Sequence, residues 1–248
     1  MKIAVAGGSG TVGTHVVRHA QAAGHEAIVL ARSHGVDLVS GHGLDLDGVD
    51  AVIDVSGTST TSAAKSRAFF EAVTRHLLDA AQVARVRHHV ALSIVGAANA
   101  PHGYYAGKAL QEQLLHDSSV PWSVLRATQF FEFAEQNAMS LFGLTVVPAM
   151  RSQPLAAALV AAELVRVAEA GVAGESAGVL PDLAGPAEMR MAEVARAIFA
   201  KTGERRRVVE LPLPGGFGRA LRDGSILPGA DAKIVGPSLE EWLAETRR

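Results

Sequence analysis

The residues with the clearest chemical potential are a tyrosine and a lysine four positions apart, Tyr104 and Lys108. A predicted helix begins near Tyr104, so a spacing of four places both side chains on one face of it. A nearby ammonium favours the phenolate form of a tyrosine and lowers its pKa from about 10 toward the range useful for proton exchange. The pair therefore predicts proton transfer to or from a carbonyl or alcohol oxygen, with Tyr104 as the acid and base.

Two further residues bear on this pair. Ser93 ends a predicted strand eleven positions before Tyr104, and we expect its hydroxyl to hydrogen-bond the same substrate oxygen. Tyr105 is adjacent to Tyr104, and consecutive helical residues point about 100° apart, so only one of the two tyrosines shares a face with Lys108. Proton transfer at an oxygen completes a carbonyl reduction when a nicotinamide supplies hydride to the carbon. This chemistry requires a dinucleotide site.

A glycine turn near the amino terminus predicts that site. The apolar run 3–6 is followed by Gly7, Gly10 and Gly13, and an amphipathic stretch comes next. Such a turn places backbone N–H groups and the positive end of a helix dipole against a diphosphate. The glycines also fit a spacing that begins at Gly8, but we favour Gly7-x-x-Gly10-x-x-Gly13. The residues expected to contact the cofactor here are Gly7, Ser9, Gly10, Thr11, Val12 and Gly13.

The end of the second predicted strand, 26–31, indicates which dinucleotide binds. Proteins that bind NAD in this way hold the adenosine ribose with a carboxylate about 20 residues past the glycines. No acidic residue lies between Ala27 and Val36. Arg32 instead offers a planar cation suited to a 2′-phosphate, and Ser33 adds a hydroxyl donor. We therefore predict binding of NADP(H) in preference to NAD.

Strand-like and helix-like segments alternate over the first half of the chain. The expected strands cover 3–6, 26–31, 51–55, 88–95 and a run from 121, and the expected helices cover 62–86 and 104–116. The first of these helices is expected to carry Phe69, Val73, Leu77, Ala80 and Ala84 on one face. This rhythm predicts an α/β fold, a Rossmann-type doubly wound parallel sheet with ligands at the carboxyl ends of its strands. Ser56 and Gly57 follow one such end and are expected at the cofactor.

The pattern becomes helical after about residue 130. Helices are expected over 156–170, 190–201 and 239–246. We divide the chain into a dinucleotide-binding domain, 1–128, and a small, mostly helical substrate-binding or lid region, 129–248, interleaved with the first. Phe130 and Phe133 follow the last clear strand, where the ligand cleft is expected to open. They are candidates for an apolar substrate pocket, with core packing as the alternative.

Composition narrows the classes of protein. A chain of 248 residues with 48% hydrophobic content suits one α/β domain with a small appendage. A formal net charge of −2 without a long basic run argues against nucleic acid and anionic membranes as partners. The absence of cysteine excludes thiolate metal sites. His88 and His89 are expected as surface or capping residues, and Asp45 and Asp47 as solvated loop acids, rather than as metal ligands. No apolar run is long enough to cross a bilayer, so we expect a cytoplasmic protein. We further expect a monomer or homodimer that acts on a small molecule.

Taken together, these motifs resemble the short-chain dehydrogenase/reductase superfamily, in the atypical or extended branch that includes NmrA-like NAD(P)H-binding proteins. The resemblance spans most of residues 1–135 and is carried by the glycine turn and by residues 91–96, 104–108 and 121–130. It implies that Tyr104 is the general acid and base, that Lys108 supports Tyr104 and binds the nicotinamide ribose, and that Ser93 helps to orient the substrate.

Three functions are open at this point. The first is an NADPH-dependent reductase, or the reverse dehydrogenase, for a small and largely apolar carbonyl or hydroxyl compound. The second is a non-catalytic, NmrA-like cofactor sensor with a protein partner, which would not require Tyr104 and Lys108 together. The third is a nucleotide-sugar epimerase or dehydratase with a retained cofactor, for which residues 129–248 look small. The joint presence of Tyr104 and Lys108 favours the first, and no residue names the substrate.

Overall fold

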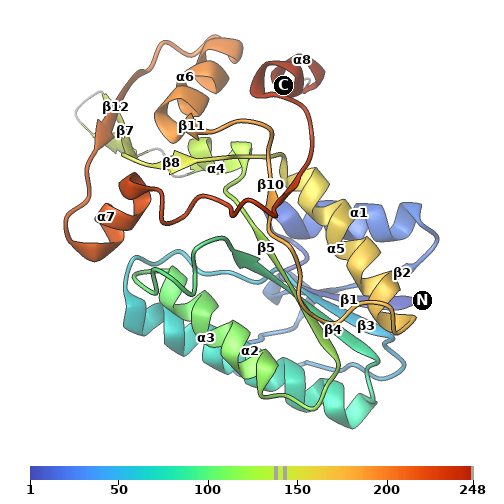
Figure 1. Cartoon of the computed structure of the whole chain (residues 1–248). Helices are drawn as coiled ribbons and strands as arrows, with labels where there is room; N and C mark the ends of the chain where they lie inside the picture. Colours follow the sequence, from blue (N-terminus) through green and yellow to red (C-terminus); the bar gives the residue numbers. More distant parts are fainter. Residues whose placement is uncertain (137–138, 142–143, 247–248) are drawn as a thin grey trace.

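A parallel sheet forms the base of the fold (Figure 1). Its strands are β1 (Lys2–Ala6), β2 (Glu26–Leu30), β3 (Ala51–Asp54), β4 (His88–Ile94), β5 (Trp122–Ala127), β9 (Gly178–Val179), β10 (Leu183–Ala184) and β13 (Lys233–Ile234). In this computed structural model, which describes residues 1–136, 139–141 and 144–246, the order is β2-β1-β3-β4-β5-β10-β13, with β9 also paired to β5. The chain leaves β1 for β2 and returns to β3 on the other side, which creates a topological switch point between β1 and β3.

Helices cover both faces of this sheet. Helices α2 (Ala63–Ala84) and α3 (Tyr105–His116) pack on one face, and α1 (Thr11–Ala22) and α5 (Ala157–Val172) pack on the other (Figure 1). The central strands are buried on both sides, which explains why they are continuous apolar runs rather than alternating ones. This arrangement confirms the predicted Rossmann-type α/β fold.

Helix α2 has nearly the predicted limits, and its buried side extends beyond the predicted face. Ser62 caps its amino end by accepting a hydrogen bond from the Lys65 N–H at 3.4 Å. The buried residues are Ser66, Phe70, Val73, Thr74, Leu77 and Ala81. Phe69, Ala80 and Ala84 pack against the same core cluster as Val73 and Leu77, as expected of one face, but these three are only partly buried. The reason is that α2 packs on α3 as well as on the sheet, so the centre of its buried side is rotated toward Phe70.

Gly107 determines how closely α3 approaches α2. A Cβ atom at this position would lie 2.3 Å from Ser66 Oγ and 2.4 Å from a Phe70 ring carbon. We expect Gly107→Ala to lower the free energy of unfolding by about 1–3 kcal/mol, because a methyl group here overpacks the contact. Urea denaturation measures this loss, with Gln113→Ala on the exposed side of α3 as the control. Equal midpoints for the two variants would contradict the close approach.

The residues after 128 contribute to two parts of the fold. Helix α5 and strands β9, β10 and β13 belong to the sheet and its cover. The others form a second layer beyond the carboxyl end of β5 (Figure 1), and they are α4 (Phe131–Gln136), β6 (Met139–Leu141), β7 (Leu144–Pro148), β8 (Arg151–Ser152), β11 (Met189–Arg190), α6 (Met191–Lys201), β12 (Arg207–Leu211), α7 (Gly215–Asp223) and α8 (Leu239–Glu245).

The expectation that this part is mostly helical was incomplete. The second layer contains a three-stranded sheet in the order β12-β7-β6 and a pair formed by β8 and β11. These strands have two to five residues each. Segments this short show too few alternations for a period of two to be recognised. Within the described residues, no helix combines the length and the apolar character needed to cross a membrane.

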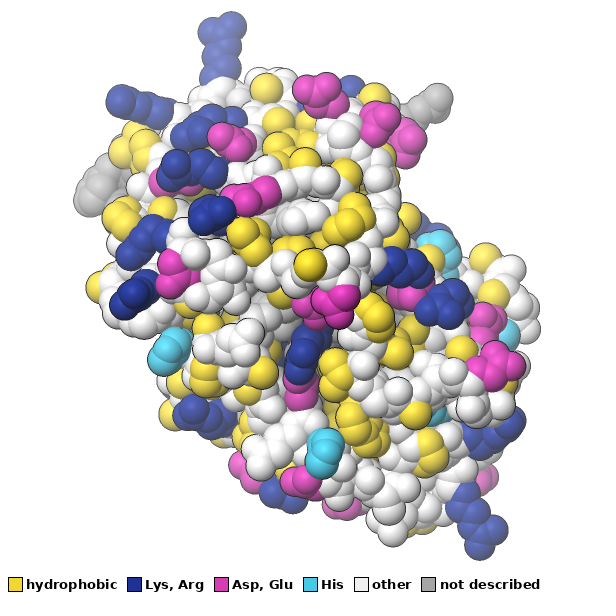
Figure 2. Space-filling view, viewed as in Figure 1, with side chains coloured by type: hydrophobic (Ala, Val, Ile, Leu, Met, Phe, Trp, Pro, Cys, Tyr) yellow, Lys and Arg dark blue, Asp and Glu magenta, His cyan; other side chains and the backbone are white. Residues whose placement is uncertain are grey.

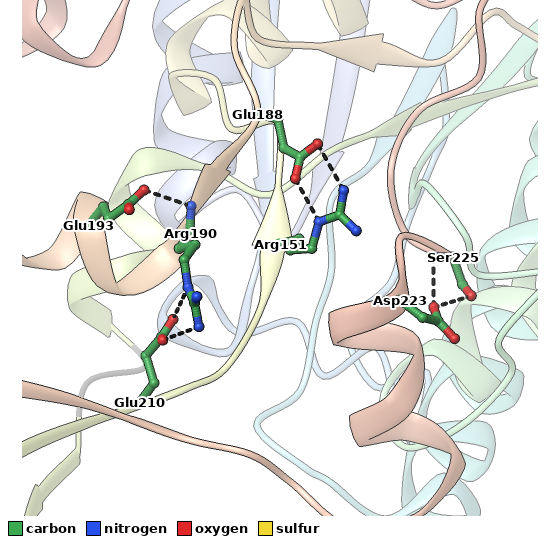
Figure 3. Close-up of polar contacts among 7 residues, drawn as sticks. All are labelled: Arg151, Glu188, Arg190, Glu193, Glu210, Asp223 and Ser225. Atoms are coloured by element: carbon green, nitrogen blue, oxygen red, sulfur yellow. Dashed lines mark hydrogen bonds and ion pairs between the residues drawn. The ribbon is translucent and has the colours of Figure 1, made fainter.

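Surface ion pairs join the strands of the second layer (Figure 3). Arg151 donates to both carboxylate oxygens of Glu188, with an Nε–Oε1 distance of 2.6 Å. Arg190 does the same with Glu210, and its backbone N–H donates to Glu193 in α6 at 3.1 Å. Water screens exposed pairs of this kind and leaves them little effect on stability, so their main role is to orient these strands. On the face seen in Figure 2, acidic and basic side chains lie among one another.

Candidate functional site

The glycine turn lies at the switch point between β1 and β3. Gly7 has φ +78°, and a Cβ atom there would lie 2.9 Å from the Cα of Ser56, which follows β3. A Cβ atom on Gly13 would lie 2.1 Å from the carbonyl oxygen of Gly7. Glycine is thus required at both positions, because the chain turns sharply at the first and helix α1 packs against the turn at the second. The turn holds the amino end of α1 at the edge of the sheet.

The surroundings of this turn fit the polar part of a dinucleotide. Ser9 and Thr11 are exposed there, whereas Val12 is buried, so Val12 can offer only its backbone to a ligand. Ser56 is 6% exposed, and its hydroxyl has no hydrogen-bond partner in the described part of the chain. A buried hydroxyl without a partner is costly, and it suits a place where a polar ligand binds. The glycine turn therefore has the properties of a diphosphate site.

Arg32 and Ser33 lie directly after β2, in the 3-10 turn Arg32–His34. Both are exposed, and Ser33 Oγ is 3.0 Å from Nδ1 of His34. Asp37, which the sequence analysis did not weigh, is the nearby acid. Its pKa is lowered first by the hydrogen bond from the Val39 N–H, and Arg32 is a smaller cause. Because Asp37 faces its own turn, the Arg32 guanidinium forms no ion pair with any residue that the structure describes.

Tyr104 and Lys108 meet on one aromatic ring, that of Phe70 in α2. The rings of Tyr104 and Phe70 pack edge to face with centroids 5.4 Å apart, and Lys108 Nζ lies 4.3 Å from the centroid of Phe70. The Tyr104 hydroxyl reaches Gly57, where a Cβ atom would lie 3.1 Å from the phenol oxygen. Since Gly57 follows Ser56, the phenol lies next to the residue that packs against the glycine turn.

Lys108 is buried, with 3% of its surface exposed, and two acceptors hold its ammonium. Nζ donates to the carbonyl oxygen of Leu92 at 2.8 Å and to Oε1 of Gln111 at 2.8 Å. Burial lowers the pKa of Lys108 to about 8, while the negative charges of Asp54 and Glu112 act in the opposite direction. The ammonium therefore titrates close to neutral pH.

The expectation that Lys108 lowers the pKa of Tyr104 was wrong. Burial raises the pKa of Tyr104, and the negative charge of Asp54 raises it further. The Lys108 ammonium donates to Leu92 and Gln111, and no hydrogen bond joins it to the phenol within the described residues. A tyrosine with a raised pKa stays protonated, which is the form that can give a proton to a carbonyl oxygen.

Tyr105 lies on the opposite side of α3. Its hydroxyl accepts a hydrogen bond from Nε2 of Gln129 at 2.7 Å, and its ring packs edge to face on Phe217 with centroids 5.6 Å apart. Tyr105 thus joins α3 to the second layer. The helix register brings Tyr104, and not Tyr105, to the side of Lys108.

Ser93 belongs to a different polar cluster. Its side chain is 1% exposed, and its hydroxyl donates to Oε1 of Glu112 in α3. Glu112 also accepts from Arg126 in β5, with an Nε–Oε1 distance of 3.0 Å. No hydrogen bond in the described chain joins Ser93 to Tyr104. The structure therefore does not bring the Ser93 hydroxyl together with the Tyr104 phenol, and its role in orienting a substrate stays a prediction.

Two polar residues beside Lys108 were missed by sequence reasoning. Asp54, the last residue of β3, is fully buried, and it accepts from the Ser56 N–H at 2.8 Å and from Nε2 of Gln111 at 2.7 Å. Gln111 is also fully buried and lies one helical turn after Lys108. The signal for Asp54 in the sequence was its place at the end of an otherwise apolar strand. The spacing of three from Lys108 was the signal for Gln111.

His88 and His89 were expected as surface or capping residues, and this expectation was wrong. They are 1% and 0% exposed, because β4 is a central strand with helices on both faces. His88 Nε2 pairs with Oγ of Ser123 at 2.9 Å, and burial lowers the pKa of His88 to about 4. Asp45 and Asp47 are exposed as expected. Among the described residues, no group of three or more His, Asp or Glu side chains is arranged to hold a metal.

Two hollows lie elsewhere. One is a cavity of about 230 Å³ lined in part by Arg126 and Asp182. The other is a groove of about 480 Å³ lined in part by Phe131, between α4, α6 and α8. The phenylalanines proposed for a substrate pocket line neither of them, since Phe130 packs on the core under α5 and Phe133 on the core of the second layer. A pocket role for Phe130 and Phe133 stays a prediction.

A glycine turn at the switch point of a parallel sheet, with a buried unpartnered hydroxyl beside it, defines a Rossmann protein that binds dinucleotides. The model of the NAD(P)H-binding family matches residues 45–170 of the chain. The chain belongs to this family, in agreement with its resemblance to the atypical branch of the short-chain dehydrogenase/reductase superfamily.

Two curated proteins resemble parts of the chain. Photosystem II assembly factor Ycf39 of Synechocystis sp. is 27% identical over 170 residues, which cover 62% of this chain and 50% of that protein. The HTH-type transcriptional regulator BetI of Ectopseudomonas mendocina is 34% identical over 107 residues, which cover 39% of this chain and 53% of that protein. The chain spans about half the length of these curated relatives.

Solved structures share the fold at low identity. The UDP-Glc/GlcNAc 4-epimerase of Campylobacter jejuni has a TM-score of 0.71 and 14% identity, over 98% of this chain and 96% of that chain. The NADPH-dependent quinone oxidoreductase of Escherichia coli, in complex with NADPH, has a TM-score of 0.60 and 20% identity, over 90% and 88% of the two chains. At these identities the likeness shows the fold alone.

Proposed function

We propose that this protein is an NADP(H)-dependent oxidoreductase that reduces a carbonyl group, or oxidises a hydroxyl group, of a small and largely apolar molecule. The observation that carries the proposal is a convergence at one edge of the sheet. The Tyr104 hydroxyl reaches Gly57, and Gly7 of the glycine turn packs on the adjacent Ser56. A proton donor and a diphosphate site thus meet at the point where parallel sheets bind ligands.

Each residue has a role in this proposal. The glycine turn binds the diphosphate, and Ser56 offers its unpartnered hydroxyl to the cofactor. A bound nicotinamide supplies or accepts the hydride. Tyr104, which its raised pKa keeps protonated, donates a proton to the carbonyl oxygen during reduction. Lys108 lies on the same Phe70 ring and stabilises the negative charge that remains on the phenol.

Turnover with the purified protein tests the proposal directly. NADPH oxidation is followed by absorbance with a panel of ketones, enones and quinones. We expect consumption of NADPH with at least one of these classes. Binding of NADPH without consumption across the panel would favour a cofactor sensor, a function consistent with a Lys108 ammonium already held by Leu92 and Gln111. NAD that stays bound through purification would favour an epimerase.

The cofactor preference rests on Arg32, and we expect NADPH to bind at least about tenfold more tightly than NADH. A guanidinium makes charge-assisted hydrogen bonds to a 2′-phosphate that the NADH ribose cannot make. Titration of Arg32→Ala with both cofactors checks this, and the variant should lose the preference while it still binds NADH. Arg18→Ala, an exposed arginine of α1, is the control and should keep the preference. Equal affinities in the unsubstituted protein would overturn the assignment.

A further inference from the structure

Building on the proposed function, we propose that Asp54 and Gln111 are positioning residues that hold the Lys108 ammonium in the orientation that serves Tyr104. The three side chains form one continuous hydrogen-bonded chain under helix α3. All three are buried, with 0%, 0% and 3% of their surfaces exposed. None of the motifs recognised in the sequence includes Asp54 or Gln111.

The Gln111 side chain is the link, and its orientation is determined at both ends. Its Oε1 accepts from Lys108 Nζ at 2.8 Å, and its Nε2 donates to Oδ2 of Asp54 at 2.7 Å. A flipped amide would set a donor against the ammonium and an acceptor against the carboxylate, so only one orientation satisfies both neighbours. Oδ1 of Asp54 accepts from the Ser56 N–H, which ties the chain to the end of β3.

The position of the ammonium follows from this chain. An ammonium has three N–H donors. Leu92 and Gln111 accept two of them, and the Phe70 ring lies 4.3 Å from Nζ. One N–H therefore has no hydrogen-bond acceptor among the described residues, and it is the donor available to the phenol of Tyr104 or to a ligand. Gln111 thus determines where the remaining N–H of the Lys108 ammonium points.

A purely structural role explains this arrangement less well. Each of two opposite charges pays a large desolvation penalty on burial, and apolar residues of similar volume often stabilise a fold as much as a buried charge pair does. Here the charges are also separated by an amide rather than paired directly. The fold carries this cost at a lysine that lies on the same Phe70 ring as Tyr104. That placement points to a role in the reaction.

Two charges face Lys108, and they come from two elements. Asp54 in β3 and Glu112 in α3 both act to raise its pKa against the effect of burial, which lowers it to about 8. Glu112 is paired with Arg126 in β5. Asp54 also raises the pKa of Tyr104 and acts to raise that of His89, whose pKa burial lowers. Loss of the Asp54 charge therefore lowers the pKa values of Lys108 and Tyr104 together.

The experiment is an NMR titration of the whole protein with ¹³C-labelled lysine. The chain has only five lysines, and Lys108→Arg identifies the signal of Lys108. In the unsubstituted protein we expect Lys108 to titrate well below the other four. Gln111→Met keeps the length of the side chain but removes the acceptor, and we expect it to lower the pKa of Lys108 further, by about one pH unit. Asp54→Asn should shift it in the same direction.

Gln113→Met is the matched control, because it is the same substitution at an exposed position of the same helix. It should leave the Lys108 titration unchanged. An unchanged titration in a folded Gln111→Met variant would overturn the proposal, and so would an unchanged titration in a folded Asp54→Asn variant. Either variant is enough for the test, so it stands even where the other fails to fold.

Turnover separates this proposal from the function on which it rests. With an accepted substrate, the pH profile of kcat should shift in Gln111→Met while KM for the substrate changes little, since Gln111 lies behind Lys108. A kcat profile identical to that of Gln113→Met would overturn the positioning role. If the Lys108 titration shifts as expected but the unsubstituted protein turns over no substrate, the oxidoreductase function fails and the link between Gln111 and Lys108 stands.

Discussion

Replacing Tyr104 with phenylalanine is expected to lower the rate of turnover by about 10²–10⁴-fold and to leave the affinity for NADPH nearly unchanged. The phenylalanine keeps the edge-to-face contact with Phe70, so helix α3 stays in place. Only the hydroxyl beside Gly57 is lost, and with it the proton donor. Steady-state kinetics with an accepted carbonyl compound and a separate NADPH titration measure the two effects.

Two variants make this result specific. Tyr105→Phe removes the hydroxyl that accepts from Gln129, on the far side of α3, and should cost stability rather than rate. Lys108→Ala should lower both turnover and NADPH affinity, since the proposed function assigns its ammonium to both the phenol and the ribose. If Tyr105→Phe were inactive and Tyr104→Phe active, the assignment of the two tyrosines would be reversed. Full activity in both would remove tyrosine from the mechanism.

The parts of the site that sequence predicts well are the local ones. The glycine turn follows directly from the strand before it and the helix after it, and a spacing of four places Tyr104 and Lys108 on one helix face whatever surrounds the helix. The central strands are equally visible, because burial on both faces leaves continuous apolar runs such as 51–53. Each of these signals is contained in a short stretch of consecutive residues.

The parts that sequence does not predict depend on distant partners. Gln111 and Asp54 are 57 positions apart, and nothing in either segment indicates that they meet. The pKa of Tyr104 was predicted in the wrong direction for the same reason, because burial and the Asp54 charge are properties of the assembled fold. His88 and His89 are polar residues that lie in the core because they belong to strand β4. Their burial follows from the central place of β4.

A valine at position 10 should lower the affinity for NADPH at least tenfold while the protein stays folded. Gly10 has φ −83° and ψ 179°, an extended conformation that any residue adopts. A Cβ atom there would lie 3.2 Å from the carbonyl oxygen of Gly7, a tight contact that a small shift relieves. The branched side chain would then occupy the amino end of α1, where the diphosphate needs backbone N–H groups.

Gly13→Val provides the contrast, because its Cβ atom would lie 2.1 Å from the Gly7 carbonyl oxygen and force the turn away from α1. We expect this variant to lose stability together with binding, whereas Gly10→Val loses binding alone. Circular dichroism follows folding, and fluorescence titration follows NADPH, with Gln21→Val on the exposed side of α1 as the control. A folded Gly10→Val protein that binds NADPH as tightly as the control would move the diphosphate away from this turn, and the proposed meeting of cofactor and Tyr104 would go with it.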